Sequence, residues 1–424
     1  MRYFYSFLLY LCLPWFFLRL LWRSRYNPAY RQRWSERLGF SPAGLHHCIW
    51  IHAVSVGETL AAIPLIKAIQ KKYPEVPLLV TNMTITGSER VRAAFGKTVF
   101  NTYIPYDTPD AVHRFLTRIN PFMLIIMETE LWPNLFAACQ DKNIPIALIN
   151  ARLSEKSARG YRLIRPVTRA MLHALNLVAA QTEKDANRFI ELGIEPKKVH
   201  ITGSLKFDMA VPSDLAAKSI SLREQLDPHR PIWIAASTHS GEEERILAAH
   251  LEIRKKVANA LLILVPRHPE RFDAVASLVE KHSLSLIRRS SHFPCNPDTA
   301  VYLGDTMGEL MLLYACSDVA FVGGSFENIG GHNMLEPAVL HKPVITGPVL
   351  FNFAEISERM VKANGMIIVT TVEQLAATVI QFFEDASYRQ RTGDHAFAVV
   401  EKNRGALQRQ LDSIYQLWNL NKMP

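Results

Sequence analysis

Short apolar runs alternate with amphipathic stretches along the chain from residue 49 onward. This alternation predicts parallel β-strands joined by crossover helices. The expected strands of the first half cover residues 49–53, 78–81, 103–105, 122–127, 145–149 and 177–180. After a polar stretch that ends near residue 230, those of the second half cover 232–236, 261–265, 285–287, 300–303, 319–322, 343–346 and 366–369. The pattern predicts an α/β protein with two doubly wound halves and a ligand cleft lined by loops that follow the strands.

The same pattern gives the expected domain boundaries. We expect an N-terminal anchor with a basic segment over residues 1–40, a first domain over 41–210 and a second domain over 211–424. Residues 392–418 have a helical pattern of apolar positions. We expect this final helix to pack back across the cleft.

The N-terminal apolar segment contains no charged side chain over residues 3–18. At about 1.5 Å per residue it reaches roughly 24 Å, less than the roughly 30 Å of a bilayer core. Spanning and shallow insertion both stay open, and a buried N-terminal helix is the alternative to a membrane segment. Six of the seven Arg among residues 1–40 follow the apolar stretch, which favours a cytoplasmic location for the main body.

The charge of the chain is concentrated near the N-terminus. The 424 residues include 48 Lys and Arg against 39 Asp and Glu, a formal net charge of +9. Residues 1–40 hold seven Arg, no Lys and one Glu, which gives +6, so the other 384 residues carry +3. A local basic excess beside an apolar segment favours an anionic membrane surface over a nucleic acid as partner. Five Cys without a C-x-x-C pair indicate a reducing compartment.

Candidate acids follow two expected strands of the first half. Glu58 ends the motif HAVSVGE after the first strand, where it could accept a proton from a substrate hydroxyl. Ser55 and Glu58 also have the spacing of a helix capping box, so a purely structural role stays open. Glu128 and Glu130 lie in METELWPNL, with Glu128 closer to the strand end. Their alternative role is to compensate the charge at the next helix N-terminus.

Candidate cations follow later strands of the same half. Arg152 and Arg159 lie in NARLSEKSARGY, a segment that suits a phosphate or carboxylate but also fits a solvated basic helix face. Lys206, in TGSLKFD, lies near the expected junction of the two halves. A long cation there could reach a ligand from either half, or it could be a solvated linker residue.

The loops of the second half suit a nucleotide phosphate. STHSGEEE offers hydroxyls and a glycine ahead of a helix, and Ser240 and Glu243 have capping-box spacing. VPRHPERF places Arg267 and His268 between two prolines that fix the turn. GDTMGEL follows another strand.

The segment GGSFENIGGHNMLEP is the most informative stretch of the second half. Its four glycines predict uncovered backbone N–H groups, and a short helix expected from Asn333 would turn its positive end toward an anion. Glu336 would then accept hydrogen bonds from ribose hydroxyls, or would merely compensate the helix charge.

Several well-known motifs do not occur in the sequence. It contains no G-x-G-x-x-G after a strand, no Walker sequence, no D-x-D, no H-E-x-x-H and no G-x-S-x-G. Dinucleotide, NTPase, metal-dependent transferase and serine hydrolase chemistry are therefore disfavoured.

Seven motifs in fixed order, HAVSVGE, METELWPN, NARLSEKS, TGSLKFD, VPRHPERF, GDTMGEL and GGSFENIGGHNMLEP, resemble the 3-deoxy-D-manno-oct-2-ulosonic acid (Kdo) transferases of lipid A biosynthesis. The resemblance implies a GT-B fold, with a Rossmann-like acceptor domain over 41–210 and a Rossmann-like nucleotide-sugar domain over 211–424. It also implies an inverting reaction without metal or cofactor, CMP-Kdo as donor and a lipid A precursor (lipid IVA) as acceptor. The implied location is the inner membrane, with the catalytic domains on the cytoplasmic side.

The resemblance also implies roles for individual residues. Glu58 would be the general base, and Glu128 and Lys206 would stabilise the transition state. We also expect Arg152 and Arg159 to help seat the acceptor phosphates. The residues implied to hold CMP are Arg267, His268, Met307, Gly308, Glu309, Asn333, Met334, Leu335 and Glu336.

Two other functions compete with this interpretation. Another membrane-associated GT-B glycosyltransferase would use a UDP-sugar, and competition between CMP and UDP would separate the two enzymes. A catalytically silent sugar-nucleotide-binding protein would keep the fold but lose the carboxylate after the first strand, and Glu58 is present.

Overall fold

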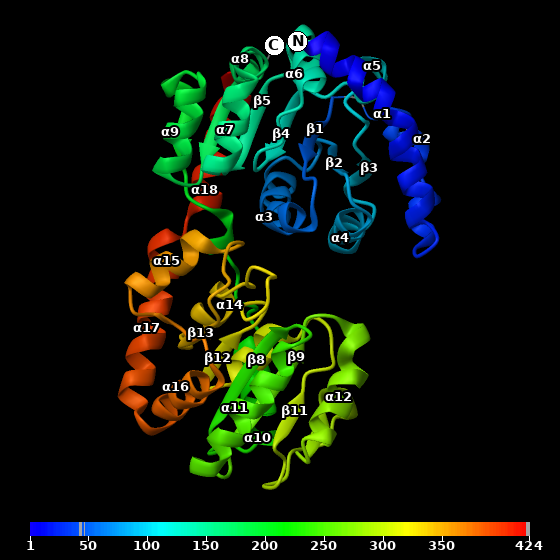
Figure 1. Cartoon of the computed structure of the whole chain (residues 1–424). Coiled ribbons are helices and arrows are strands. Elements are labelled where there is room, and N and C mark those ends of the chain that lie inside the picture. The colour runs from blue at the N-terminus through cyan, green and yellow to red at the C-terminus, as the bar shows by residue number, and fades with distance from the viewer. Residues whose placement is uncertain (42–44, 46, 421–424) are drawn as a thin grey trace. The chain divides into compact units, whose positions relative to one another are not determined.

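The computed structural model describes residues 1–41, 45 and 47–420 (Figure 1). The chain divides into two compact units. Unit 1 comprises Met1–Asp208 together with Arg404–Pro424, and unit 2 comprises Met209–Asn403. Each unit is built around its own parallel sheet.

The sheet of unit 1 has seven strands in the order β3-β2-β1-β4-β5-β6-β7, and all neighbouring strands are parallel. This order is that of a doubly wound sheet, which grows outward in both directions from its first strand. The strands are β1 (Ile49–His52), β2 (Leu78–Asn82), β3 (Phe100–Tyr103), β4 (Met123–Met127), β5 (Ile146–Ala151), β6 (Leu175–Ala180) and β7 (Val199–Ile201).

The α-helices of unit 1 are α1 (Arg2–Arg23), α2 (Trp34–Arg37), α3 (Val56–Lys72), α4 (Ile85–Phe95), α5 (Pro109–Ile119), α6 (Pro133–Asp141), α7 (Glu155–Leu163), α8 (Arg165–Ala174), α9 (Glu183–Leu192) and α18 (Ala406–Leu420). The 3-10 helices are η1 (Pro28–Arg31), η2 (Pro196–Lys198) and η3 (Leu205–Phe207). The long helices cover both faces of the sheet, because side chains of alternate strand residues are apolar on each face. On one face Trp50 packs on Phe115, with 5.0 Å between ring centroids.

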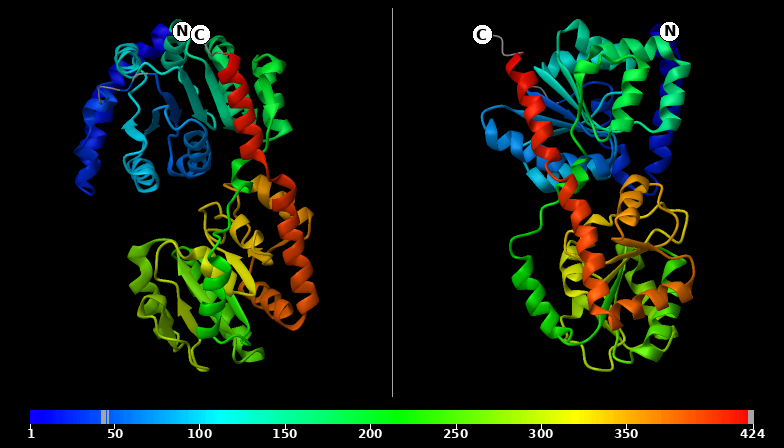
Figure 2. Two further views of the ribbon diagram at one scale, coloured as in Figure 1. Left: turned by 180° about the vertical axis from the view of Figure 1, so that it is seen from behind. Right: turned by 90° about the vertical axis from the view of Figure 1, so that its left-hand side faces the viewer.

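The C-terminal helix α18 covers part of the other face of this sheet. The rings of Tyr73 and Trp418 stack with centroids 4.1 Å apart, and Phe122 meets Trp418 edge to face. Figure 2 shows α18 in red beside the strands of unit 1.

Unit 2 repeats the doubly wound arrangement with the strand order β10-β11-β9-β8-β12-β13-β14, again fully parallel. Its strands are β8 (Ile232–Thr238), β9 (Leu261–Pro266), β10 (Leu286–Arg288), β11 (Val301–Leu303), β12 (Val319–Val322), β13 (Val344–Thr346) and β14 (Met366–Ile368). Its α-helices are α10 (Leu215–Gln225), α11 (Glu242–Lys256), α12 (Phe272–Lys281), α13 (Leu310–Cys316), α14 (Leu335–Ala338), α15 (Ala354–Lys362), α16 (Val372–Glu384) and α17 (Ala386–Asn403). Two 3-10 helices, η4 (Pro269–Arg271) and η5 (Arg289–Ser291), complete it.

The predicted α/β class and the two doubly wound halves are confirmed, and two local expectations are wrong. The strand expected over 103–105 lies at Phe100–Tyr103 instead. Its first residue, Phe100, is exposed, so the buried apolar run that indicates a strand begins only at its end. The single helix expected over 392–418 is two helices, α17 and α18. Gly405 separates them with φ +85°, a left-handed conformation that a continuing helix does not allow.

Helix α1 is long and apolar enough to cross a membrane, judged by length and composition alone. In the structure it also contacts the rest of unit 1. The Asn134 side chain donates to the Ser6 hydroxyl at 2.9 Å, and the Tyr10 hydroxyl lies 2.6 Å from an Asp110 carboxylate oxygen. Further along the helix, Phe16 stacks on Tyr106 with centroids 5.3 Å apart.

Candidate active site

Glu58 is held at the start of α3, directly beyond the carboxyl end of β1. Ser55 is the N-cap of this helix and accepts the Glu58 N–H at 3.2 Å. One carboxylate oxygen of Glu58 accepts the Ser55 hydroxyl at 2.7 Å, and the other accepts the Val54 N–H at 2.7 Å. The capping geometry is therefore present, with the return bond made to Val54 instead of Ser55. These bonds fix the orientation of the carboxylate.

The environment of Glu58 favours its protonated form. The residue is 7% exposed. Burial raises the pKa of Glu58 from 4.5 to about 7, and the negative charges of Glu128 and Glu130 act in the same direction against the hydrogen bonds from Ser55 and Val54. A carboxylate whose pKa lies near neutrality is suited to accept a proton during catalysis. Capping and base chemistry are thus compatible in one residue.

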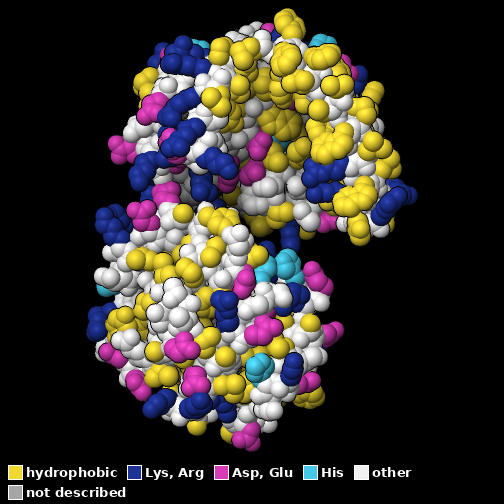
Figure 3. Space-filling view, in the orientation of Figure 1, with side chains coloured by type: hydrophobic (Ala, Val, Ile, Leu, Met, Phe, Trp, Pro, Cys, Tyr) yellow, Lys and Arg dark blue, Asp and Glu magenta, His cyan; other side chains and the backbone are white. Residues whose placement is uncertain are grey.

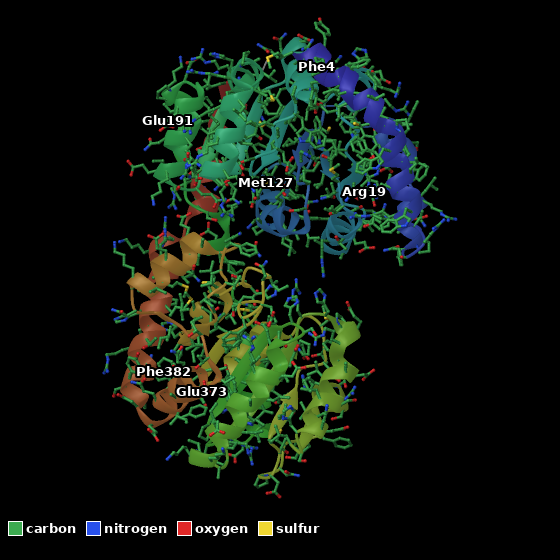
Figure 4. All side chains as sticks on the ribbon, viewed as in Figure 1. Phe4, Arg19, Met127, Glu191, Glu373 and Phe382 are labelled. Carbon is green, nitrogen blue, oxygen red and sulfur yellow. The ribbon has the colours of Figure 1, made fainter. Side chains whose placement is uncertain are left out.

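Glu128 follows β4, the strand that pairs with β1. It adopts φ +59°, an unusual left-handed conformation for a residue other than glycine, and its N–H donates to the Ile149 carbonyl at 2.9 Å. Met127, labelled in Figure 4, marks the end of β4 immediately before it. The next helix begins only at Pro133 and has no acidic residue in its first turn. Glu128 therefore does not compensate the positive charge at the N-terminus of that helix.

Glu130 lies beside the same group of acids. It accepts the Trp132 indole N–H at 2.9 Å, and burial raises its pKa, with the charge of Glu128 adding to the effect. Trp132 also meets the buried His52 ring edge to face at 5.4 Å. The carboxyl ends of β1 and β4 therefore bring Glu58, Glu128 and Glu130 into one electrostatically coupled cluster.

Lys206 supplies a positive charge to this cluster from η3. Burial lowers the pKa of Lys206, the negative charge of Glu128 opposes that change, and the positive charge of Arg152 adds to it. Lys206, Glu128 and Arg152 therefore lie within electrostatic reach of one another. Glu128 is also within electrostatic reach of Glu58, so it links the acids to the two cations.

Arg159 lies elsewhere on unit 1. It is on the exposed face of α7, where its guanidinium lies 3.3 Å from the Glu155 carboxylate, one turn away. Its side chain is 75% exposed. Glu155 also contacts Arg162 and Arg188, which makes this group a surface ion-pair network.

Two residues outside the predicted set fix the segment that carries Lys206. The Asn150 side-chain oxygen accepts the Leu205 N–H at 3.0 Å, and Asn150 adopts φ +53° inside β5. The carboxylate of Asp208 accepts the N–H groups of Gly405 and Leu407 at the start of α18. Sequence patterns miss both contacts because each joins segments far apart in the chain. The sequence offered one signal for each residue, because Asn150 begins the motif NARLSEKS and Asp208 ends the motif TGSLKFD.

Two of the residues predicted to bind CMP, Arg267 and His268, lie at a group of three histidine rings in unit 2. Arg267 and His268 follow β9, and the His268 ring meets the His239 ring edge to face at 5.3 Å. The Nε2 atoms of His239 and His332 lie 2.7 Å apart, so one ring donates to the other. Burial lowers the pKa of His332 to about 4, and the positive charge of Arg267 contributes. His239 and His332 were not predicted.

The glycine segment leaves fewer N–H groups uncovered than expected. The N–H groups of Gly323 and Gly331 donate to the Ala236 and Gly324 carbonyls, and that of Gly324 donates to Glu242. The fully buried Glu242 carboxylate accepts the N–H groups of His239, Gly324, Ser325 and Phe326 at 2.7–3.0 Å. Gly324 must be glycine here, since a Cβ would lie 2.6 Å from the His332 ring at φ +67°. An internal carboxylate thus holds residues 324–326 of the loop in shape.

Helix α11 also starts differently from the prediction. Its N-cap is Gly241, so Ser240 does not cap it. Glu243 instead accepts the Thr238 hydroxyl at 2.9 Å and pairs with Arg271 at 2.9 Å. Both acids at this helix start serve internal contacts.

The structure also corrects the prediction for residues 332–336, the HNMLE segment. Helix α14 begins at Leu335 and has four residues, so no extended helix N-terminus starts at Asn333. The Asn333 amide donates to Glu336 at 3.2 Å, and burial raises the pKa of Glu336. The side chains of Met334 and Leu335 are fully buried, which leaves only their backbone groups for a ligand. Asn333 and Glu336 stay suited to hydroxyl recognition.

Met307, Gly308 and Glu309 lie on the loop between β11 and α13. Met307 is 59% exposed, and Gly308 and Glu309 line a cavity of about 360 Å³ together with residues of α10. Glu309 accepts two hydrogen bonds from Arg289 at 2.9 and 3.0 Å, which lower its pKa. Its carboxylate is therefore an organised acceptor on the cavity wall. Within the part of the chain that the structure describes, no three His, Cys, Asp or Glu side chains gather closely enough to hold a metal ion.

Solved structures share the architecture of most of the chain. The UDP-GlcNAc 2-epimerase from Neisseria meningitidis bound to UDP-GlcNAc aligns with a TM-score of 0.58 at 15% identity, covering 87% of this chain and 99% of that chain. A glycosyltransferase from Rickettsia africae aligns with a TM-score of 0.56 at 14% identity, covering 89% and 99%. With its two doubly wound domains, the protein has the GT-B glycosyltransferase fold.

Sequence relatives identify the family within that class. A profile described as 3-Deoxy-D-manno-octulosonic-acid transferase (kdotransferase) matches residues 32–209. The 3-deoxy-D-manno-octulosonic acid transferase of Haemophilus influenzae is 45% identical over 419 residues, covering 97% of both chains. That of Bordetella pertussis is 36% identical over 384 residues, covering 88% of both. The chain belongs to the Kdo transferase family, glycosyltransferases of lipopolysaccharide biosynthesis, which confirms the resemblance of the motifs.

Proposed function

We propose that the protein transfers Kdo from CMP-Kdo to a lipid A precursor, lipid IVA, by an inverting mechanism without a metal ion. The observation that carries the proposal is the placement of Glu58, whose buried carboxylate is fixed by Ser55 and Val54 and has a pKa of about 7. Such a group is partly ionised near neutral pH and basic enough to remove a hydroxyl proton.

The chemical step is a direct displacement at the anomeric carbon of Kdo. The acceptor hydroxyl oxygen forms a bond to that carbon while the bond to the CMP phosphate oxygen breaks, and the hydroxyl proton passes to Glu58. CMP leaves with the electron pair of the broken bond. A single base and a single displacement invert the configuration. Unit 1 supplies the base and the acceptor site in this proposal, and unit 2 holds the nucleotide.

Electrostatics stabilise the transition state in the proposed mechanism. The anomeric carbon gains positive charge, which the Glu128 carboxylate favours, while Lys206 favours negative charge on the departing group. Arg267, His268 and His239 offer cationic or donor groups for the CMP phosphate on unit 2. These side chains take the place of a divalent cation. Arg152, beside Lys206, is placed to help seat an acceptor phosphate, and Arg159 extends the basic surface.

We place the remaining donor contacts on two loops of unit 2. Met307, Gly308 and Glu309 would hold CMP through the cavity that Gly308 and Glu309 line. Asn333, Glu336 and the backbone of Met334 and Leu335 would hold its ribose and base. The protein would act at the cytoplasmic side of the inner membrane, with α1 as the anchor.

One experiment tests the reaction directly. The full-length protein is incubated with CMP-Kdo and tetra-acylated lipid A precursor in EDTA, and the lipid is analysed by mass spectrometry. We expect the mass of one or more Kdo residues to be added, with competition by CMP stronger than by UDP. A requirement for added magnesium, or equal competition by UDP, would contradict the proposal.

A further inference from the structure

One face of α1 lies on the rest of unit 1, and the other face is exposed and apolar. Ser6 and Phe16 are on the inner face, where they contact Asn134 and Tyr106. The exposed large apolar residues recur at helical spacing on the opposite face: Phe4, Phe7, Leu11, Trp15, Leu18 and Trp22. Figure 3 shows hydrophobic side chains gathered over the part of unit 1 where Figure 1 places α1. Such a helix suits the membrane interface, with its axis in the membrane plane.

A cavity of about 490 Å³ lies between α1 and the body of unit 1. Its size is within the roughly 300–1,000 Å³ typical of ligand sites. Leu9, Phe16 and Leu20 line it from α1, and Ile85 and Tyr106 line it from the body. The cavity is therefore largely apolar.

The charged residues of the cavity are mainly cationic. Arg19, Arg23 and Arg37 line it against the single acid Asp107, among the lining residues that the structure describes. Arg19, labelled in Figure 4, and Arg23 are one helical turn apart near the end of α1. The Arg23 guanidinium lies over the Tyr30 ring at 5.8 Å. An apolar chain with an anionic group at one end matches this distribution.

The cavity wall is joined to the proposed base by two hydrogen bonds. Met83, on the wall, donates its N–H to the Val54 carbonyl at 3.2 Å, and the Val54 N–H donates to Glu58 at 2.7 Å. On another side the wall residue Trp132 donates to Glu130. The Met83 and Trp132 side of the cavity therefore lies next to the acid cluster.

We propose that this cavity holds an acyl chain of the lipid acceptor, with a phosphate group of the same molecule bound by Arg19 and Arg23. The inference rests on the proposed function and extends it, because α1 becomes part of the acceptor site as well as an anchor. With the outer face of α1 in the bilayer, an acyl chain enters the cavity sideways without crossing water. Each methylene of the acyl chain then moves from the apolar bilayer into an apolar cavity, so it is not exposed to water.

A matched pair of variants of the full-length protein tests the cavity. Leu20→Trp fills it, whereas Leu18→Trp makes the same change on the exposed face. We expect Leu20→Trp to raise KM for the acylated acceptor by about tenfold or more, the loss expected for excluding two methylenes. KM for the deacylated sugar phosphate should stay unchanged, and Leu18→Trp should alter neither value. An equal effect of both variants, or the same rise on both acceptors, would overturn the proposal.

A second measurement uses the unaltered protein. An acceptor with a photoreactive diazirine in one acyl chain is cross-linked in nanodiscs, and peptides are identified by mass spectrometry. We expect labelling at residues 16–23 and 83–86, and a diazirine-labelled phospholipid should not label 83–86. Equal labelling by the phospholipid would show that bulk lipid fills the cavity and would overturn the proposal. If unaltered enzyme transfers Kdo to neither acceptor, the proposed function fails, while the labelling pattern still tests the cavity.

Discussion

The carboxylate of Asp208 accepts the backbone N–H of Gly405 at 2.6 Å, although the two residues are 197 positions apart. A second bond from the Leu407 N–H makes Asp208 the acceptor for the first turn of α18. Arg409 and Gln410 add bonds to the carbonyls of Thr202 and Gly203 at 2.8 and 3.0 Å. The end of the chain therefore holds the segment on which Lys206 lies, and the C-terminal helix contributes to the position of that cation.

We predict that Asp208→Ala lowers both stability and turnover. Loss of a helix cap lowers the free energy of unfolding by about 1 kcal/mol, and freedom of the neighbouring Lys206 lowers kcat more than it changes KM for the donor. Thermal unfolding and initial rates measure the two effects. Asp412→Asn, on the exposed side of α18, is the control and should alter neither. A variant of Asp208 with lower melting temperature but normal kcat would limit its role to stability.

Glu58→Gln keeps an oxygen that can cap α3 but removes the basic carboxylate. We expect kcat to fall by roughly 10²- to 10⁴-fold with donor affinity nearly unchanged. In the unaltered enzyme kcat should rise with pH through about 7, since the base must be ionised and the pKa of Glu58 is about 7. This rise should vanish in Glu58→Gln. Turnover that survives in both Glu58→Gln and Glu58→Ala, with stability lost in the alanine variant, would favour the capping role alone.

The raised pKa of Glu58 also predicts how stability depends on pH. The folded protein keeps a proton on Glu58 up to about pH 7, whereas an unfolded glutamate loses it near 4.5. Stability from this group is therefore present at low pH and is lost between about pH 4.5 and 7, by up to about 3 kcal/mol. Glu58→Gln should be more stable than the unaltered protein at pH 8 and similar at pH 4. Denaturant unfolding at both pH values measures this difference.

Most of the fold could be predicted from the sequence because buried parallel strands are short, apolar and bounded by polar loops. Strand β12 coincides with the predicted range 319–322, and β1 differs from its predicted range by one residue. The errors arose where periodicity carries less information. Phe100 starts an edge strand with an exposed side chain, and Gly405 breaks a helix whose apolar pattern continues on both sides.

The candidate site could be predicted only as far as motif positions allow. The motifs indicate which loops carry Glu58, Glu128 and Lys206, because the ends of parallel strands meet at one edge of a sheet. They do not indicate that Glu242 accepts three N–H groups of the glycine segment, since these contacts join residues about 80 positions apart. Glycines imply available backbone donors, and sequence alone does not show whether the protein itself uses them.

Glu242→Gln should loosen the glycine segment of unit 2. The carboxylate accepts four N–H groups, and an amide offers one oxygen while its NH₂ group faces other donors. Hydrogen bonds to a charged group contribute about 1.5–3 kcal/mol each, so we expect a clear fall in melting temperature and a higher KM for the donor. The exposed Glu244→Gln on the same helix is the control. If Glu242→Gln left the KM for CMP-Kdo unchanged, the shape of this loop would not contribute to nucleotide binding.

Arg152 and Arg159 provide a charge-reversal comparison between two parts of unit 1. Arg152→Glu places a negative charge beside Lys206 and Glu128, so it should repel an acceptor phosphate and raise the acceptor KM by about tenfold. Arg159→Glu should have a smaller effect that disappears at high salt, because Arg159 is 75% exposed and already pairs with Glu155. Initial rates against acceptor concentration at low and high salt measure both. If neither reversal changes the acceptor KM at low salt, the acceptor phosphates bind elsewhere.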